Sequence, residues 1–228
     1  VLTDTFQLFE QDKDMIANLL PDNSQRRTNQ KKQNLTVIFG NPPYSKGQTS
    51  ADDNAANIKY PNLDKRIEET YAANSRATNK NALYDSYIKA FRWASDRIGS
   101  EGIIAFITNA GWIEGNSMEG FRKSLSTEFD KIYICNLRGN ARTSGELRRK
   151  EKGNVFGSGT RTPVAITFLI KSKFNSSEEG EINIYDIGDY LTTEQKLSKI
   201  SKTESIKTII EKDEFEIVEP DDDNNWIN

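Results

Sequence analysis

The chain has 228 residues, 35% of them hydrophobic, with 34 acidic against 31 basic residues, one cysteine and no histidine. This length is enough for one domain with its own core, and the lack of histidine excludes Ser-His-Asp and HExxH chemistry. A single cysteine excludes a disulfide framework and a cysteine zinc finger. The many carboxylates leave a magnesium site possible, but we assign no residue to a metal.

Five apolar segments rich in β-branched residues predict strands. They are residues 35–40, 102–108, 131–137, 163–171 and 181–187. Residues 82–98 and 117–129 place apolar side chains three to four apart, which predicts amphipathic helices between the first three strands. This alternation predicts an α/β fold with a mostly parallel sheet and helices on both faces. Because no helix separates the last strands, we expect one of them to run antiparallel at the edge.

Two connections are longer than compact domains usually contain, and such loops are often functional. Residues 45–81 are polar, with a short helix predicted around 63–73. The second connection, residues 139–162, is called the basic loop, because seven basic and two acidic residues lie between positions 138 and 161. This charge predicts contacts with phosphates, although a basic run also suits a merely solvated surface. The candidate phosphate contacts are Arg138, Arg142, Arg148, Arg149 and Lys150.

The first predicted strand runs directly into Asn41, Pro42, Pro43 and Tyr44. In open α/β sheets, ligands bind beyond the carboxyl ends of the strands. Two successive prolines stiffen the backbone and remove two N–H donors, while asparagine adds a carbonyl acceptor and tyrosine adds an aromatic face. The four residues, called the Asn-Pro-Pro-Tyr turn, therefore suit a planar ligand with an exocyclic amino group. A chance turn of the same residues is the plainer alternative.

Such a turn can activate an aromatic amine, which is a poor nucleophile because its lone pair is delocalised. The Asn41 side-chain oxygen and the Pro42 carbonyl can each accept one amino hydrogen, while the ring stacks on Tyr44. Acceptors placed in this way draw the nitrogen towards tetrahedral geometry and stabilise its developing positive charge. The predicted reaction is therefore transfer of a group to a ring amine, without a histidine or a metal.

The hexapeptide Phe-Gly-Asn-Pro-Pro-Tyr at residues 39–44 resembles motif IV of S-adenosylmethionine-dependent methyltransferases that modify adenine N6 in DNA. The resemblance extends to the modification domain of single-polypeptide, Type I-like (ISP) restriction–modification enzymes. The segments that carry it are residues 1–8, 79–97, 108–112, 136–142, 153–156, 187–190 and 225–228. The resemblance implies a Rossmann-like class I methyltransferase fold and site-specific methylation of DNA.

The resemblance also implies roles for residues outside the turn. Asp4 is similar to the acid that accepts a hydrogen bond from the cofactor adenine, and Phe6 would pack on that ring; a plain turn residue is the alternative for Asp4. Phe156 is similar to an aromatic residue that stacks on the flipped adenine opposite Tyr44, with ordinary packing as its alternative. The basic loop would hold phosphates while the base leaves the duplex.

One departure from the family pattern concerns the cofactor. The Gly-rich motif that wraps S-adenosylmethionine should precede the Asn-Pro-Pro-Tyr turn by well over fifty residues, and only forty residues precede Asn41 here. We therefore expect an incomplete fold that lacks its N-terminal cofactor-binding half and binds the cofactor weakly, with little or no turnover. Residues 1–190 would be the C-terminal part of the catalytic domain, and residues 191–228 a linker or the start of the next region.

The expected partners are duplex DNA with a flipped adenine and the other domains of a parent polypeptide: nuclease, translocase and target recognition. The apolar runs are too short to span a membrane, and the resemblance implies the bacterial cytoplasm. Methylation of RNA or of glutamine in proteins, and a non-catalytic DNA-binding module, remain alternatives. Cys135 is expected to be a buried apolar residue rather than a nucleophile, and Trp112 either packs in the core or lines the pocket.

Overall fold

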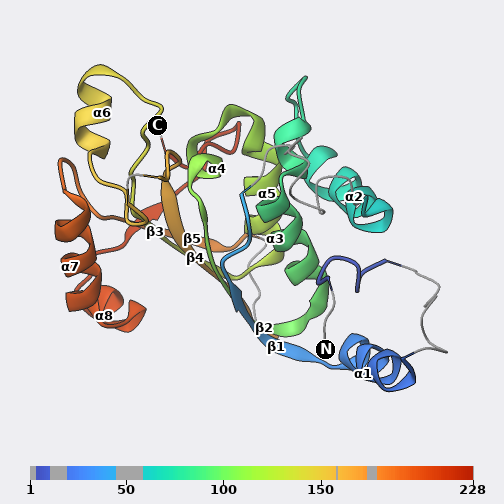
Figure 1. Ribbon diagram of the computed structural model, residues 1–228. Helices are drawn as coiled ribbons and strands as arrows, with labels where there is room; N and C mark the ends of the chain where they lie inside the picture. The colour runs from blue at the N-terminus through green and yellow to red at the C-terminus, as the bar shows by residue number, and fades with distance from the viewer. Residues whose placement is uncertain (1–3, 11–19, 45–58, 158, 174–178, 228) are drawn as a thin grey trace.

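The computed structural model describes residues 4–10, 20–44, 59–157, 159–173 and 179–227. Its centre is a six-stranded mixed sheet with the strand order β1-β2-β4-β3-β5-β6 (Figure 1). The strands are β1 (Leu35–Gly40), β2 (Ile98–Asn109), β3 (Lys131–Asn136), β4 (Val164–Lys171), β5 (Glu181–Asp186) and β6 (Glu216–Val218). All five predicted strands are therefore present, and the short β6 was not predicted.

The direction of β4 corrects one expectation. β1, β2, β3 and β5 point the same way, whereas β4 runs antiparallel between β2 and β3 in the middle of the sheet, and β6 is the antiparallel strand at the edge. The chain leaves β3 and re-enters the sheet from the same side, so the next strand has to run in reverse. Hydrogen bonds from Leu137 N to Val164 O (2.8 Å) and from Ala110 N to Pro163 O (2.9 Å) extend this pairing to the loops.

Helices cover both faces of the sheet, as predicted (Figure 1). The α-helices are α1 (Pro21–Lys32), α2 (Pro61–Ile67), α3 (Ser86–Arg97), α4 (Gly111–Glu114), α5 (Glu119–Glu128), α6 (Gly145–Glu151), α7 (Thr193–Thr203) and α8 (Ile206–Glu211). Among the described residues, shorter helices join them: η1 (Glu68–Ala72, a π-helix), η2 (Asn81–Tyr84) and η3 (Asn116–Met118). α3 and α5, flanked by η2 and η3, occupy the two predicted helical segments, and α2 with η1 occupies the helix expected around residues 63–73. The rest of the loop predicted at 45–81 lies partly outside the described residues, because 45–58 are not described.

Two apolar clusters reflect the two faces of the sheet. The larger one packs α3 and α5 against residues such as Ile104 and Ile134, while the smaller one packs α8 against residues such as Cys135 and Tyr185. Neighbouring strand residues point to opposite faces, so Ile134 and Cys135 belong to different clusters. None of the helices in the described part of the chain is long and apolar enough to cross a membrane.

The segment after residue 190 packs onto the domain. Trp226 is 3% exposed and lies edge-on to the buried Trp112, with ring centroids 5.6 Å apart. The buried Arg122 guanidinium donates to Asn224 O (2.7 Å) and to Asn225 Oδ1 (3.1 Å), which fixes the terminal segment. Trp112 is therefore a core residue and does not line an open pocket; the division of the chain at residue 190 stays a prediction.

The β1 side of the sheet is less covered. Beyond β2, β1 has no other strand beside it in the described structure. Val37 is 59% exposed and Phe39 is 82% exposed on the face opposite α3, and Ile103 on β2 is 39% exposed. Large apolar side chains gathered at an open strand edge are typical of a surface that another protein segment covers.

Candidate active site

The Asn-Pro-Pro-Tyr turn begins where β1 ends, at the carboxyl end of the sheet. Ile38 anchors β1 in the larger cluster, and the turn then leaves the core. Asn41 and Pro43 are exposed, while Pro42 and Tyr44 are half-buried. The turn is therefore accessible to a ligand from solvent, as its predicted role in ligand binding requires.

Tyr44 is held in place by its neighbours. Its ring packs edge-on against Tyr87 of α3, with centroids 6.3 Å apart, and burial raises the pKa of its hydroxyl. The hydroxyl therefore stays protonated near neutral pH and donates to Asn41 Oδ1 at 3.3 Å. This contact is long for a hydrogen bond between two oxygens, and a carbonyl oxygen has two lone pairs. Asn41 thus retains an acceptor for a ligand.

Asp4 and Phe6 lie together against the start of α2. Asp4 Oδ2 accepts a hydrogen bond from the Tyr60 hydroxyl (2.6 Å), and Asp4 Oδ1 accepts one from Phe6 N (2.9 Å). The rings of Phe6 and Tyr60 meet edge-on at 5.3 Å. Burial and the contact with Asp4 raise the pKa of Tyr60. The two residues proposed for the cofactor thus form one cluster, and Tyr60 is a further member that was not predicted from the sequence.

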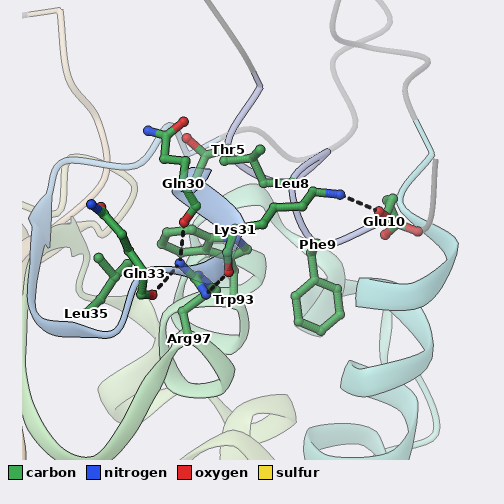
Figure 2. Close-up of a pocket in the computed structure, with 10 residues that line it drawn as sticks. All are labelled: Thr5, Leu8, Phe9, Glu10, Gln30, Lys31, Gln33, Leu35, Trp93 and Arg97. Carbon is green, nitrogen blue, oxygen red and sulfur yellow. Dashed lines mark hydrogen bonds between the residues drawn. The ribbon is translucent and has the colours of Figure 1, made fainter. Parts of the chain in front are cut away.

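A cavity of about 540 Å³ lies beside this cluster, near the start of β1 (Figure 2). Arg97 lines it and donates to the carbonyl oxygens of Gln30, Lys31 and Gln33. Lys31 Nζ in turn donates to Glu10 O at 3.1 Å. Because Leu35, at the start of β1, is part of the wall, this cavity lies at the opposite end of β1 from the Asn-Pro-Pro-Tyr turn. The cavity lining was not predicted from the sequence.

The five candidate phosphate contacts differ in their surroundings. Arg138 is mostly buried and pairs with Asp186 (2.7 Å) and Asp189 (2.6 Å). Lys150 lies 3.5 Å from Asp189, and Arg149 lies 3.2 Å from Glu146. These ion pairs neutralise part of the positive charge that was predicted to contact the phosphates of DNA.

The remaining two are Arg142, which is exposed, and Arg148, which is half-buried. Arg148 Nη1 donates to Lys152 O at 2.8 Å and so helps to close the end of α6. Arg142 and Arg149 are thus the two candidates that are exposed, and Arg149 is paired with Glu146. Residue 158 of the basic loop lies outside the described residues.

Phe156 lies in the basic loop and is 47% exposed. Its N–H donates to Asn154 Oδ1 at 3.0 Å, so a tight turn presents the ring. The loop and the Asn-Pro-Pro-Tyr turn both leave the carboxyl side of the sheet, with β2 and β4 between β1 and β3. Three strand spacings correspond to about 14 Å, so the two loops leave the sheet on either side of the ends of β2 and β4.

Cys135 is buried on β3, and burial raises the pKa of its thiol to about 12. The thiolate that a nucleophile needs is therefore absent at neutral pH. This confirms the prediction that Cys135 is an apolar packing residue.

Comparison with known proteins identifies the family. Residues 3–142 match the Eco57I restriction-modification methylase family. A nuclease-deletion mutant of the Type ISP restriction-modification enzyme LlaGI, solved with a DNA substrate mimic, is 44% identical with a TM-score of 0.90, covering 100% of this chain and 18% of its own. The ATP-dependent Type ISP enzyme LlaBIII bound to DNA is 41% identical with a TM-score of 0.91, covering 100% of this chain and 15% of its own.

The DrdV–DNA complex is 38% identical with a TM-score of 0.80, covering 90% of this chain and 19% of its own. This chain thus spans less than a fifth of the length of each of these three structures. No match was found among curated proteins. The resemblance to Type ISP restriction–modification enzymes inferred from the sequence is confirmed, and the chain belongs to the Eco57I restriction-modification methylase family.

Proposed function

We propose that this chain is the base-binding part of a DNA adenine-N6 methyltransferase within a restriction–modification enzyme. The observation that carries the proposal is the accessible Asn-Pro-Pro-Tyr turn at the carboxyl end of β1. Asn41 Oδ1 and the Pro42 carbonyl would accept the two hydrogens of the adenine amine, and Tyr44 would stack on the purine. Held in this way, the amine nitrogen aims its lone pair away from the ring plane.

The described residues would provide only part of a binding site for S-adenosylmethionine. When bound, it supplies the methyl group that the amine receives. Asp4 would accept a hydrogen bond from the cofactor adenine, and its carboxylate is held in place by hydrogen bonds from Tyr60 and Phe6. Tyr60 would hold Asp4 in position, and Phe6 would pack beside the ring.

The rest of the cofactor site would come from another segment of the parent polypeptide. The exposed Val37, Phe39 and Ile103 support this, because they form an apolar face next to the Asn-Pro-Pro-Tyr turn. We propose that the cofactor-binding half of the domain covers this face. Without that half, the chain would bind S-adenosylmethionine weakly and transfer little or no methyl group.

Duplex DNA is the proposed substrate, with the target adenine turned out of the helix. The basic loop would contact phosphates, chiefly through Arg142 and the other surface cations, while Arg138 serves the fold. Phe156 would stack on the extruded base from the side opposite Tyr44. The relatives solved with DNA support this substrate over RNA or a protein amide.

Labelled methyl transfer by the full-length parent tests the proposal. Duplex DNA, RNA and protein extracts would each be incubated with enzyme and labelled S-adenosylmethionine, and the modified base identified by mass spectrometry. We expect label only in DNA, as N6-methyladenine. Asn41→Ala should reduce the rate about 10²- to 10³-fold, as does the loss of one preorganised polar contact in other enzymes. The exposed Asn29→Ala on α1 is the matched control; label in RNA or protein, or an unimpaired Asn41 variant, would refute the proposal.

A further inference from the structure

The described part of the basic loop is closed by two buried polar side chains that no step of the proposed reaction uses. Lys196 of α7 is fully buried, and its ammonium donates to three carbonyl oxygens: Leu137 O (2.8 Å), Glu151 O (3.0 Å) and Gly153 O (2.7 Å). Leu137 follows β3 just before the loop, Glu151 is the last residue of α6, and Gly153 follows that helix. One cation therefore ties together segments that would otherwise separate.

Asn154 closes the loop from inside. Its Nδ2 donates to Gly139 O (3.1 Å) and to Thr162 O (2.8 Å), which are the first and last residues of the loop. Its Oδ1 accepts from Phe156 N (3.0 Å). The same side chain thus fixes the loop ends and the turn that presents Phe156.

The backbone leaves little freedom around these two residues. Gly139 has φ +94°, and a Cβ atom there would lie 2.8 Å from Asn154 Nδ2. A Cβ atom on Gly153 would lie 2.3 Å from Thr193 N. Arg138 (φ 55°) and Lys152 (φ 33°) also adopt positive φ. Such conformations cost energy and persist only where surrounding contacts impose them.

We propose that Lys196 is a positioning residue that, with Asn154, holds the basic loop in its DNA-contacting shape before DNA binds. Burial lowers the pKa of Lys196 to about 8, while three carbonyl acceptors favour the charged form; a buried lysine with this many partners is specific to one loop geometry. The part of the inference that concerns DNA rests on the proposed function, whereas the rigidity of the loop does not.

Lys196→Met and Lys199→Met form a matched pair in the full-length parent. Lys199 lies one turn along α7, but its ammonium donates to Ile187 O (2.9 Å), outside the basic loop. We expect amide hydrogen exchange in the loop to accelerate about 10-fold or more in Lys196→Met, because hydrogen bonds to a charged donor are lost. The exchange of the same amides should be unchanged in Lys199→Met.

Methylation kinetics separate positioning from general damage. A loop that has lost its shape binds DNA less well in ground state and transition state alike, so we expect KM for DNA to rise about 10-fold with kcat little changed. A merely structural role would lower the active fraction, and with it the apparent kcat, at constant KM. Asn154→Asp, which removes both Nδ2 donors at nearly constant volume, should reproduce the result if Lys196→Met fails to fold.

Amide hydrogen exchange in the wild-type enzyme tests the inference without any substitution. The Gly153 N–H donates to Leu191 O (3.0 Å) and the Ala141 N–H to Arg161 O (3.0 Å), so both amides should be protected without DNA and gain little when it binds. Protection that appears only with DNA, or a Lys196 variant that behaves like the Lys199 variant, would overturn the inference. An enzyme that methylates no DNA but has a protected, Lys196-dependent loop would refute the proposed function alone.

Discussion

The two loops that flank the candidate base site are built in opposite ways. The Asn-Pro-Pro-Tyr turn is exposed at the end of β1, beside the open apolar face of Val37 and Phe39. The basic loop, in contrast, is fixed at its root by Lys196 and Asn154, both buried. The difference suggests that the turn depends on other parts of the enzyme to complete its site, whereas the conformation of the basic loop is already fixed before DNA binds.

The first prediction probes the open side of this comparison and has the largest expected effect. Phe39→Ala should destabilise the isolated chain by less than about 0.5 kcal/mol, since substitutions at exposed positions have small effects. In the full-length parent, where we propose that Phe39 is covered, the loss should approach about 3 kcal/mol, as for a buried phenylalanine. Urea unfolding of both proteins measures the difference; equal losses would mean that nothing covers this face.

Tyr44→Ala should weaken binding of the extruded base by about 1–3 kcal/mol, the range for base–aromatic stacking. Tyr44→Phe keeps the ring and should retain nearly all of this affinity. Fluorescence of 2-aminopurine at the target position in the duplex reports the stacking. A Tyr44→Ala variant with wild-type fluorescence and affinity would rule out the stacking role.

Arg142 and Arg138 represent two kinds of basic residue: Arg142 in the basic loop is exposed, whereas Arg138 beside it is paired with two aspartates. Arg142→Ala should reduce the slope of log affinity for DNA against log salt by about 1, as expected for one lost phosphate contact. Arg138→Gln should leave this slope unchanged and instead destabilise the fold by about 1 kcal/mol, because Asp186 and Asp189 lose their contacts with the Arg138 guanidinium. Salt titrations by fluorescence anisotropy, together with urea unfolding, would show whether these assignments are reversed.

Glu119 gives the smallest effect and depends on pH. Its burial raises the pKa, but hydrogen bonds from Ser75 Oγ, Arg76 N and Ala77 N outweigh burial, so the pKa is lowered overall. A lowered pKa means that the carboxylate stabilises the fold above its unfolded-state pKa and that this is lost as pH falls through the folded-state pKa. Glu119→Gln should thus reduce stability at pH 7 by less than about 1 kcal/mol. The deficit should disappear in acid; a deficit independent of pH would contradict the assignment.

Local sequence patterns were enough for much of the fold. The segments that became β2 and β3 were visible because each is a run of apolar residues rich in isoleucine, and α3 was visible from its apolar spacing. The central place of β4 was not visible, because it depends on the route of the chain after β3. α1 has no buried residue and so lacks an apolar stripe. The start of α7 did carry a signal in the sequence, the capping box of Thr192 and Gln195.

The candidate site likewise has features that could be predicted from the sequence and features that could not. The Asn-Pro-Pro-Tyr turn is contiguous, so its accessible position at the end of a strand followed from the sequence. The role of Arg138 did not, because its partners Asp186 and Asp189 lie about fifty residues away and pair with it only in the folded sheet. Lys196 was equally invisible, since its three acceptors are backbone carbonyls. Every residue has a backbone carbonyl, so contacts of this kind leave no pattern of residue types in the sequence.

The central claim is that Asn41 binds the amino group of the target adenine. A double-mutant cycle tests it most directly: affinity is measured for the full-length parent and its Asn41→Ala variant, on duplexes with either adenine or purine lacking the 6-amino group at the target. The cycle cancels the easier extrusion of purine, which pairs more weakly with thymine than adenine does. We predict a coupling of about 1 kcal/mol, the typical net value of one hydrogen bond. A coupling indistinguishable from zero would contradict the account.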